Sequence, residues 1–138
     1  MERLRIEPDE YLDAVARQVV DAAFKVHSTL GPGLMESVYE KCMIFELHAR
    51  GLECQTQVDL PIVYKGCKID QGLRIDMVVE GCLIVEIKAV EQLAPVHRAQ
   101  ILTYLKLTGN NLGLLINFNT VLIKDGIKRI VHTVRITE

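Results

Sequence analysis

Two acidic residues and one lysine interrupt segments that are otherwise strongly apolar. The segments, residues 73–79 and 83–90, flank a Glu-Gly pair and contain Asp76, Glu86 and Lys88. Their β-branched and aliphatic residues predict a largely buried hairpin. A buried charge is costly unless it is paired or binds a metal, so these three residues are candidates for a chemical role.

The length of the hairpin loop decides whether the three side chains meet. Glu86 and Lys88 project from one face of a strand because side chains alternate with a period of two. A two-residue loop would turn the carboxylate of Asp76 away, whereas a three-residue loop places it on that same face. Such a loop commonly ends in a left-handed residue, for which Gly81 is suited. We therefore predict an odd loop and one face holding all three charges.

Two carboxylates beside a lysine form a site for a hard divalent cation. Mg²⁺ or Mn²⁺ would complete its coordination with water and with phosphate oxygens of a substrate. The lysine could then orient or deprotonate the attacking water, which is the chemistry of metal-assisted phosphodiester hydrolysis. A structural ion pair of Lys88 with Asp76 or Glu86 is the alternative, because such pairs also occur without catalysis.

The spacing of these residues resembles a known group of enzymes. Asp76 followed by Glu86-Ile87-Lys88 is similar to the Asp…Glu-x-Lys core of the PD-(D/E)XK, or restriction-endonuclease-like, nuclease superfamily. Residues 33–39, Gly-Leu-Met-Glu-Ser-Val-Tyr, fit the Gly-x-x-Glu-x-x-Tyr motif of its GxxExxY family. Pro-Val-His-Arg-Ala-Gln at 95–100 and Leu-Leu-Ile-Asn-Phe at 114–118 are similar to later blocks of that family, and the resemblance covers about residues 13–131.

The resemblance implies an α/β (α+β) fold, a mixed β-sheet flanked by helices with an αβββαβ core. It also implies a metal held by Asp76, Glu86 and the backbone carbonyl of Ile87. Lys88 would position water and stabilise charge on the phosphate, and two residues would assist: Glu36 directly or through water, and Gln100 by supporting the lysine. From the local sequence alone, Glu36 could instead complement a helix dipole, and Gln100 could be an ordinary solvated residue.

Three further residues are candidates for contacts with the substrate: Tyr39, Arg74 and His97. Arg74 and His97 each have a plainer alternative. Arg74 could pair with a neighbouring acid, and His97 could be a surface or structural histidine.

Periodicity predicts the remaining elements. Helices are expected at 9–30, 34–50 and from Pro95 to before Gly109. Short β segments are expected at 53–64 and 67–70, and strands at 73–79, 83–90, 112–118 and 127–136. The expected packing side of the second helix is Leu34, Val38, Phe45 and Cys42; that of the third is Val96, Ala99, Leu102, Leu105 and Ile101. Lys124, Lys128, Arg129 and Arg135 could form a phosphate-facing strip or a solvated edge.

Composition narrows the class of protein. The 138 residues suit a single domain, 1–138, with no apolar run long enough for a membrane span and no apolar leader, so we expect a cytoplasmic protein. The four cysteines lack close spacing, which favours buried thiols over disulfides or zinc ligands. The net charge of −2 argues against tight, non-specific DNA binding.

These observations predict a metal-dependent nuclease acting on DNA or RNA. The alternative is a non-catalytic protein that keeps the fold and engages nucleic acid or a protein partner. A homodimer through an edge strand or the first helix is a further hypothesis.

Overall fold

The computed structural model describes residues 3–135, without the side chains of residues 70, 71 and 135. Its main sheet is mixed, with the strand order β2-β3-β4-β5-β6, and a small sheet pairs β1 with β7. The helices are α1 (Glu10–Leu30), α2 (Glu36–Ala49), α3 (Pro95–Thr108) and the short 3₁₀ helix η1 (Ile123–Gly126). The strands are β1 (Arg3–Arg5), β2 (Cys54–Tyr64), β3 (Cys67–Val79), β4 (Leu83–Lys88), β5 (Leu112–Asn117), β6 (Ile127–Val131) and β7 (Thr133–Arg135).

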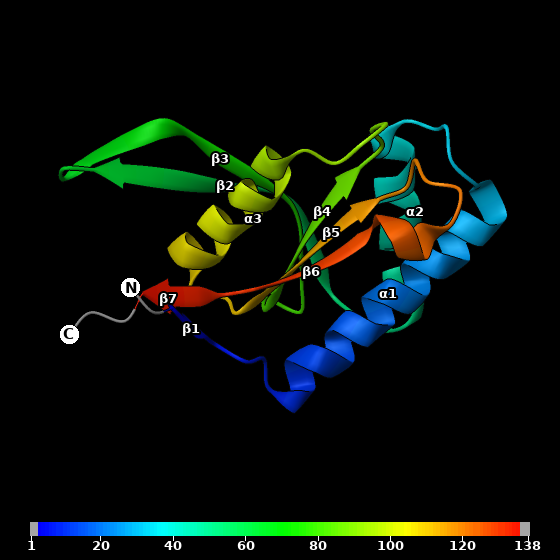
Figure 1. Cartoon of the computed structure of the whole chain (residues 1–138), viewed down its shortest axis with the longest axis horizontal. Helices are drawn as coiled ribbons and strands as arrows, with labels where there is room; N and C mark the ends of the chain where they lie inside the picture. Colours follow the sequence, from blue (N-terminus) through cyan, green and yellow to red (C-terminus); the bar gives the residue numbers. More distant parts are fainter. Residues whose placement is uncertain (1–2, 136–138) are drawn as a thin grey trace.

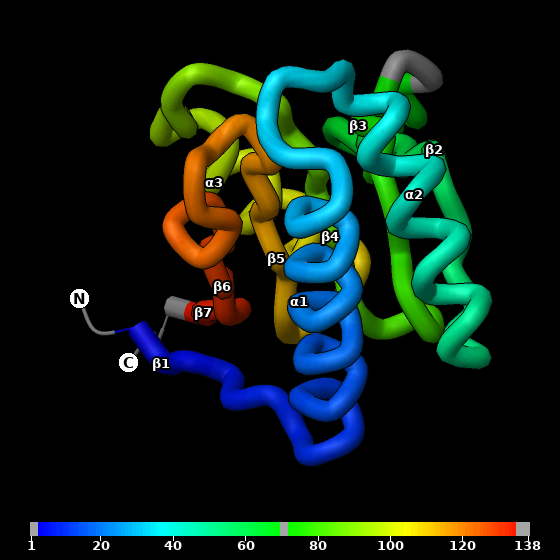
Figure 2. The backbone as a smooth tube through the Cα atoms, turned by 90° about the vertical axis from the view of Figure 1, so that its right-hand side faces the viewer, coloured from blue at the N-terminus to red at the C-terminus, as the bar shows by residue number. Residues whose placement is uncertain are grey.

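The sheet separates two layers of helices (Figures 1 and 2). α1 and α2 pack on one face, and α3 packs on the other, where it connects the parallel strands β4 and β5. The other neighbouring strands of the main sheet are antiparallel. The order α2-β2-β3-β4-α3-β5 contains the expected αβββαβ core, so the predicted fold class is confirmed.

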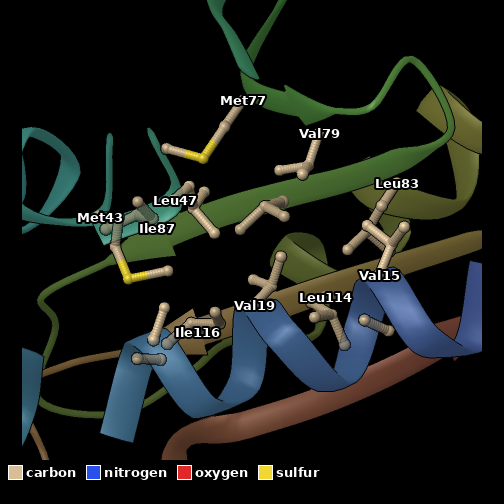
Figure 3. Close-up of a cluster of buried hydrophobic side chains, with 14 of the residues drawn as sticks. Val15, Val19, Met43, Leu47, Met77, Val79, Leu83, Ile87, Leu114 and Ile116 are labelled. Carbon is tan, nitrogen blue, oxygen red and sulfur yellow. The ribbon is translucent and has the colours of Figure 1, made fainter. Parts of the chain in front are cut away.

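Each face of the sheet has its own hydrophobic core. Leu83 and Ile87 of β4 join the core beneath α1 and α2, which Figure 3 shows together with Val19 and Leu47. Ile84 lies in the second core, against α3. Because β4 alternates between these cores, its even-numbered residues face α3.

The predicted packing side of α2 is wrong. Its buried residues are Tyr39, Met43 and Leu47, whereas Val38 and Phe45 are exposed. The helix carries two apolar stripes, and the buried one includes a tyrosine whose ring stacks on Phe118 at 4.5 Å between centroids. An aromatic ring with a polar tip can be buried where the hydroxyl finds partners, and this one does.

The predicted packing side of α3 is wrong in part. Ile101 and Leu105 are buried as expected, but Val96 and Ala99 are exposed and Tyr104 takes their place. The helix is therefore rotated so that the stripe containing Gln100 and Tyr104 turns toward the sheet. This rotation matters for the site below.

The predicted final strand at 127–136 is interrupted. β6 ends at Val131, His132 bonds to the loop before β5, and the chain continues as β7. The N–H of His132 donates to the carbonyl of Asn111 at 2.9 Å, and the N–H of Ile6 donates to the carbonyl of His132 at 2.8 Å. Residue 136 lies outside the described residues. No helix within residues 3–135 has the length and apolarity that a membrane crossing requires.

Candidate functional site

The hairpin between β3 and β4 has the predicted odd loop. Met77 pairs with Val85 and Val79 with Leu83, which leaves residues 80–82 as a three-residue loop. Its first two residues, Glu80 and Gly81, have positive φ angles of 53° and 67°. The glycine therefore adopts the expected left-handed conformation, in the middle of the loop rather than at its end.

Asp76 and Glu86 lie where the two strands stop pairing. The ladder between β3 and β4 ends at Met77 and Val85, and side chains replace it beyond that point. The N–H of Ile87 donates to Oδ2 of Asp76 at 3.0 Å, and the N–H of Asp76 donates to Oε1 of Glu86 at 3.1 Å. Each carboxylate is thus fixed by the backbone of the opposite strand, and the two acids share one opening in the sheet.

Two carboxylates this close together disfavour the state in which both are ionised. Glu86 is only 2% exposed, and burial followed by the charge of Asp76 raises the pKa of its carboxyl to about 8. The N–H of Asp76 and the charge of the half-buried Lys88 act in the opposite direction. Burial and the charge of Asp76 therefore favour the protonated form of Glu86 where no cation is bound.

Tyr104 borders the site, although it was not among the residues predicted to act there. It is 1% exposed, and its hydroxyl donates to the carbonyl of Arg74 at 3.1 Å. Burial, with smaller contributions from the charges of Glu86 and Asp76, raises the pKa of its phenol to about 12. Its position four residues after Gln100 is the signal that could have identified it, because residues four apart lie on one face of a helix.

Asn117 fixes the chain that follows Lys88. Its Oδ1 accepts from the N–H of Val90 at 3.0 Å, and its Nδ2 donates to the carbonyl of Val90 at 2.9 Å. The side chain is buried at the end of β5. A single polar residue inside the apolar run at 114–118 was the available signal, since buried amides need partners.

Glu36 is not brought into a metal-binding cluster with the two acids. It is exposed in the first turn of α2, the position in which a carboxylate complements the helix dipole. Across residues 3–135, no group of three or more His, Cys, Asp or Glu side chains is arranged to hold a metal ion. The structure brings two of the predicted acids together, Asp76 and Glu86.

The structure places the other predicted residues, Gln100, His97 and Arg74, in three different environments. Gln100 is half-buried on the stripe of α3 that faces the sheet. His97 accepts at Nδ1 from the N–H of Ala94 at 3.0 Å and so caps the start of α3. Arg74 is exposed and pairs with Asp59 at 3.1 Å, the plainer of its two expected roles.

Tyr39 is fully buried, which leaves it no surface for a substrate. Its hydroxyl donates to the carbonyl of Gly31 at 2.6 Å and accepts from the N–H of Leu34 at 3.1 Å. The expected substrate contact therefore finds no support, and the residue instead joins the end of α1 to the start of α2.

The donor set at the opening fits a hard divalent cation. Two carboxylates converge there, and the carbonyl of Ile87 points to the same edge of β4 as its N–H, toward Asp76. Oxygen donors of this kind suit Mg²⁺ or Mn²⁺, which bind few protein ligands and keep several waters. The positive charge would also relieve the repulsion that raises the pKa of Glu86.

Comparison with known proteins gives one match. Searches of curated proteins and of solved structures return no match. The family model of the PD-(D/E)XK nuclease superfamily matches residues 13–130, a span that includes most of α1, the whole of α2 and α3, and all the residues of the site. The chain belongs to the PD-(D/E)XK nuclease superfamily.

Proposed function

We propose that this protein is a divalent-metal-dependent nuclease that hydrolyses phosphodiester bonds of nucleic acid. The observation that carries the proposal is the opening between β3 and β4, where the carboxylates of Asp76 and Glu86 are held by reciprocal backbone hydrogen bonds. Membership of a nuclease superfamily supports the same reaction class. The fold alone would not, because function depends on the site.

In this proposal the metal is held by Asp76, Glu86 and the carbonyl of Ile87. A bound Mg²⁺ or Mn²⁺ supplies positive charge that polarises the phosphate and lowers the pKa of water. Lys88, on the same face of β4 as Glu86, orients the attacking water and stabilises negative charge on the phosphate. Gln100 supports the lysine from α3, and Glu36 acts through water.

We also propose that the chain belongs to the GxxExxY family within the superfamily. The supporting observation is that Gly33 and Tyr39 of that motif belong to one corner between α1 and α2, where the Tyr39 hydroxyl bonds to the backbone on both sides. The motif then serves to set the start of α2, and with it Glu36.

The test is cleavage of labelled single- and double-stranded DNA and RNA with Mg²⁺, Mn²⁺ or chelator. Asp76→Asn and Lys88→Met keep the size of the side chains while removing a ligand charge and a cation. Asp125→Asn and Lys106→Met make the same chemical changes at exposed positions elsewhere. We expect cleavage that requires metal, falls at least about a hundredfold in the first two variants, and is unchanged in the controls.

If no substrate is cut, titration with Mn²⁺ separates the remaining cases. Binding that Asp76→Asn abolishes would keep the metal site and place the failure in the choice of substrate. An absence of both binding and cleavage would reject the proposal in favour of a non-catalytic protein that engages nucleic acid or a protein partner.

Dimerisation is proposed separately, through the first helix. A surface pocket of about 640 Å³ lies between α1 and the sheet, with Val20, Phe24 and Ile127 among its apolar lining residues. Arg17 and Asp21 on the same stretch of helix give a two-fold related copy opposite charges to meet. A solution mass of two chains that Phe24→Glu reduces to one would support this contact, and a single-chain mass for the parent protein would reject it.

A further inference from the structure

The hairpin of β2 and β3 extends beyond the rest of the sheet. β3 pairs with β4 only over Met77–Val79, and the part further from the site pairs with β2 alone. Figure 1 shows this two-stranded segment, residues 60–73, projecting past α3; we call it the arm. The arm begins close to Asp76, and its tip lies about 30 Å further along β3, at roughly 3.3 Å for each residue from Cys67 to Asp76.

The outer part of the arm exposes apolar side chains. Val63, Tyr64 and Ile69 are 66%, 63% and 41% exposed, whereas Leu60 and Leu73 near its base pack against the core beneath α3. A two-stranded hairpin is marginally stable in water, and exposed apolar groups on it indicate a surface for a partner.

The charged residues of the arm indicate what kind of partner this surface binds. The sequence of the arm contains Lys65, Lys68 and Asp70 as its charged residues, a net charge of +1 in a chain whose net charge is −2. Nζ of Lys65 lies 5.5 Å from the centroid of the Tyr64 ring. An exposed aromatic ring beside lysines is the combination that binds a nucleotide, with the base stacked on the ring and the phosphate near the cations.

A pocket lies along the arm from Lys68 to its base. It has a volume of about 680 Å³, and both Lys68 and Arg74 line it. Val63 pairs with Lys68 and Asp59 with Arg74 in the ladder, so the basic residues follow one strand from the tip toward the site. Asp59 also lines this pocket and already pairs with Arg74.

We propose that the arm binds a single-stranded segment of nucleic acid, stacking a base on Tyr64 and leading the strand to the proposed metal site. This inference rests on the nuclease function proposed above and specifies its substrate. A single strand is favoured over a duplex because its bases are free to stack, whereas affinity for a duplex would require many more phosphate contacts than this chain offers.

The first test measures binding separately from cleavage. Fluorescence anisotropy with single-stranded and duplex oligonucleotides, in chelator, gives affinities and their salt dependence. We expect Tyr64→Ala to weaken single-strand binding at least about fivefold, as loss of one stacked base does. Lys65→Gln with Lys68→Gln should reduce the slope of log affinity against log salt by about 1.4, for two phosphates on a single strand. Lys25→Gln with Lys41→Gln, at exposed positions of α1 and α2, is the matched control and should change neither quantity.

The second test uses a thiol that the arm already carries. Cys67 is exposed and pairs with Tyr64 in the ladder, while the other three cysteines are half-buried. A single-stranded oligonucleotide should slow the alkylation of Cys67 and leave Cys82 unaffected. Tyr64→Ala should remove this protection. Thermal melting of each variant confirms that the arm has not simply unfolded.

The outcomes separate the arm from the catalytic function. Equal affinity of parent and arm variants, preference for duplex, or an absence of binding would each overturn the inference. Metal-dependent cleavage that ignores the arm variants would keep the nuclease proposal and reject the arm. Arm-dependent binding of the oligonucleotide, with neither cleavage nor binding of Mn²⁺, would uphold the binding surface and reject the nuclease proposal.

Discussion

Asp76 and Glu86 illustrate how two acids can be fixed in place and still repel each other. Their backbone hydrogen bonds set the geometry, since each carboxylate accepts from the opposite strand. Their charges and burial make the doubly ionised pair unfavourable, and the pKa of Glu86 rises to about 8. The site therefore holds a proton where a cation is expected to bind.

This proton predicts how metal binding depends on pH. Below about pH 8 the cation must displace the proton from Glu86, so the affinity for Mn²⁺ should rise about tenfold per pH unit and then level off above the pKa. Calorimetry in buffers of different ionisation enthalpy should detect about one proton released per metal at pH 7. An affinity that does not change between pH 6 and pH 8 would contradict the assignment.

Tyr104→Phe removes a single oxygen from the border of the site. The carbonyl of Arg74 then loses its hydrogen bond from the tyrosine, and Asp76 lies two residues further along β3. We expect a loss of about 1 kcal/mol in the free energy of unfolding and a weaker affinity for Mn²⁺. Tyr11→Phe, which removes an exposed hydroxyl, is the control. A variant with unchanged metal affinity would make Tyr104 purely structural.

At the scale of elements, we expect the corner between α1 and α2 to contribute to the stability of the fold and not to the chemistry of the site. Tyr39→Phe should cost about 1–2 kcal/mol of unfolding free energy, because the hydroxyl bonds to Gly31 and Leu34, while the stack on Phe118 remains. Denaturant unfolding measures the loss. Affinities for metal and oligonucleotide should stay within about twofold; a selective loss of oligonucleotide binding would restore the substrate contact expected from the sequence.

The elements that the sequence predicted well are those with a single strong signal. Asp9 caps α1, Gly109 ends α3 in a left-handed conformation, and apolar runs with a turn between them define β3 and β4. The face shared by Asp76 and Glu86 followed from loop length and strand alternation. These are local rules, and they do not depend on what packs against each element.

The helix faces were harder to predict because both helices are ambiguous in apolar pattern. α2 has two apolar stripes, and only the tertiary contact of Tyr39 with Phe118 decides which one is buried. α3 buries Tyr104 in place of Val96, which periodicity alone would not select. The sequence could not show that Glu36 stays outside a metal-binding group with the two acids, because this depends on distances between elements, which no local pattern contains.

At the scale of the whole molecule, the two cores explain how a charged opening can be maintained. Leu83 and Ile87 on one face of β4 and Ile84 on the other anchor the strand in both layers. The strand is therefore fixed even where its pairing with β3 ends. β4 therefore contributes to the stability of the domain through its apolar residues and to the candidate site through Glu86.

This connection predicts a dependence of stability on pH. The pKa of Glu86 is about 8 in the folded protein against 4.5 for an ordinary glutamate, so the folded state holds this proton more tightly than the unfolded chain. The corresponding stability is complete below about pH 4.5 and is lost as pH rises through about 8. In chelator, the Tm should fall by at least about 3 °C across this range, the shift for roughly 1 kcal/mol in a domain of this size.

Glu86→Gln should remove that pH dependence, because the amide cannot ionise, and calorimetric melts of both proteins from pH 5 to pH 9 make the comparison. Added Mn²⁺ should raise the Tm of the parent protein most at the alkaline end, where both carboxylates are ionised and binding stabilises the folded state. The variant should gain less from the metal at every pH. A parent protein that Mn²⁺ stabilises equally at pH 5 and pH 9 would place the ion somewhere other than between Asp76 and Glu86.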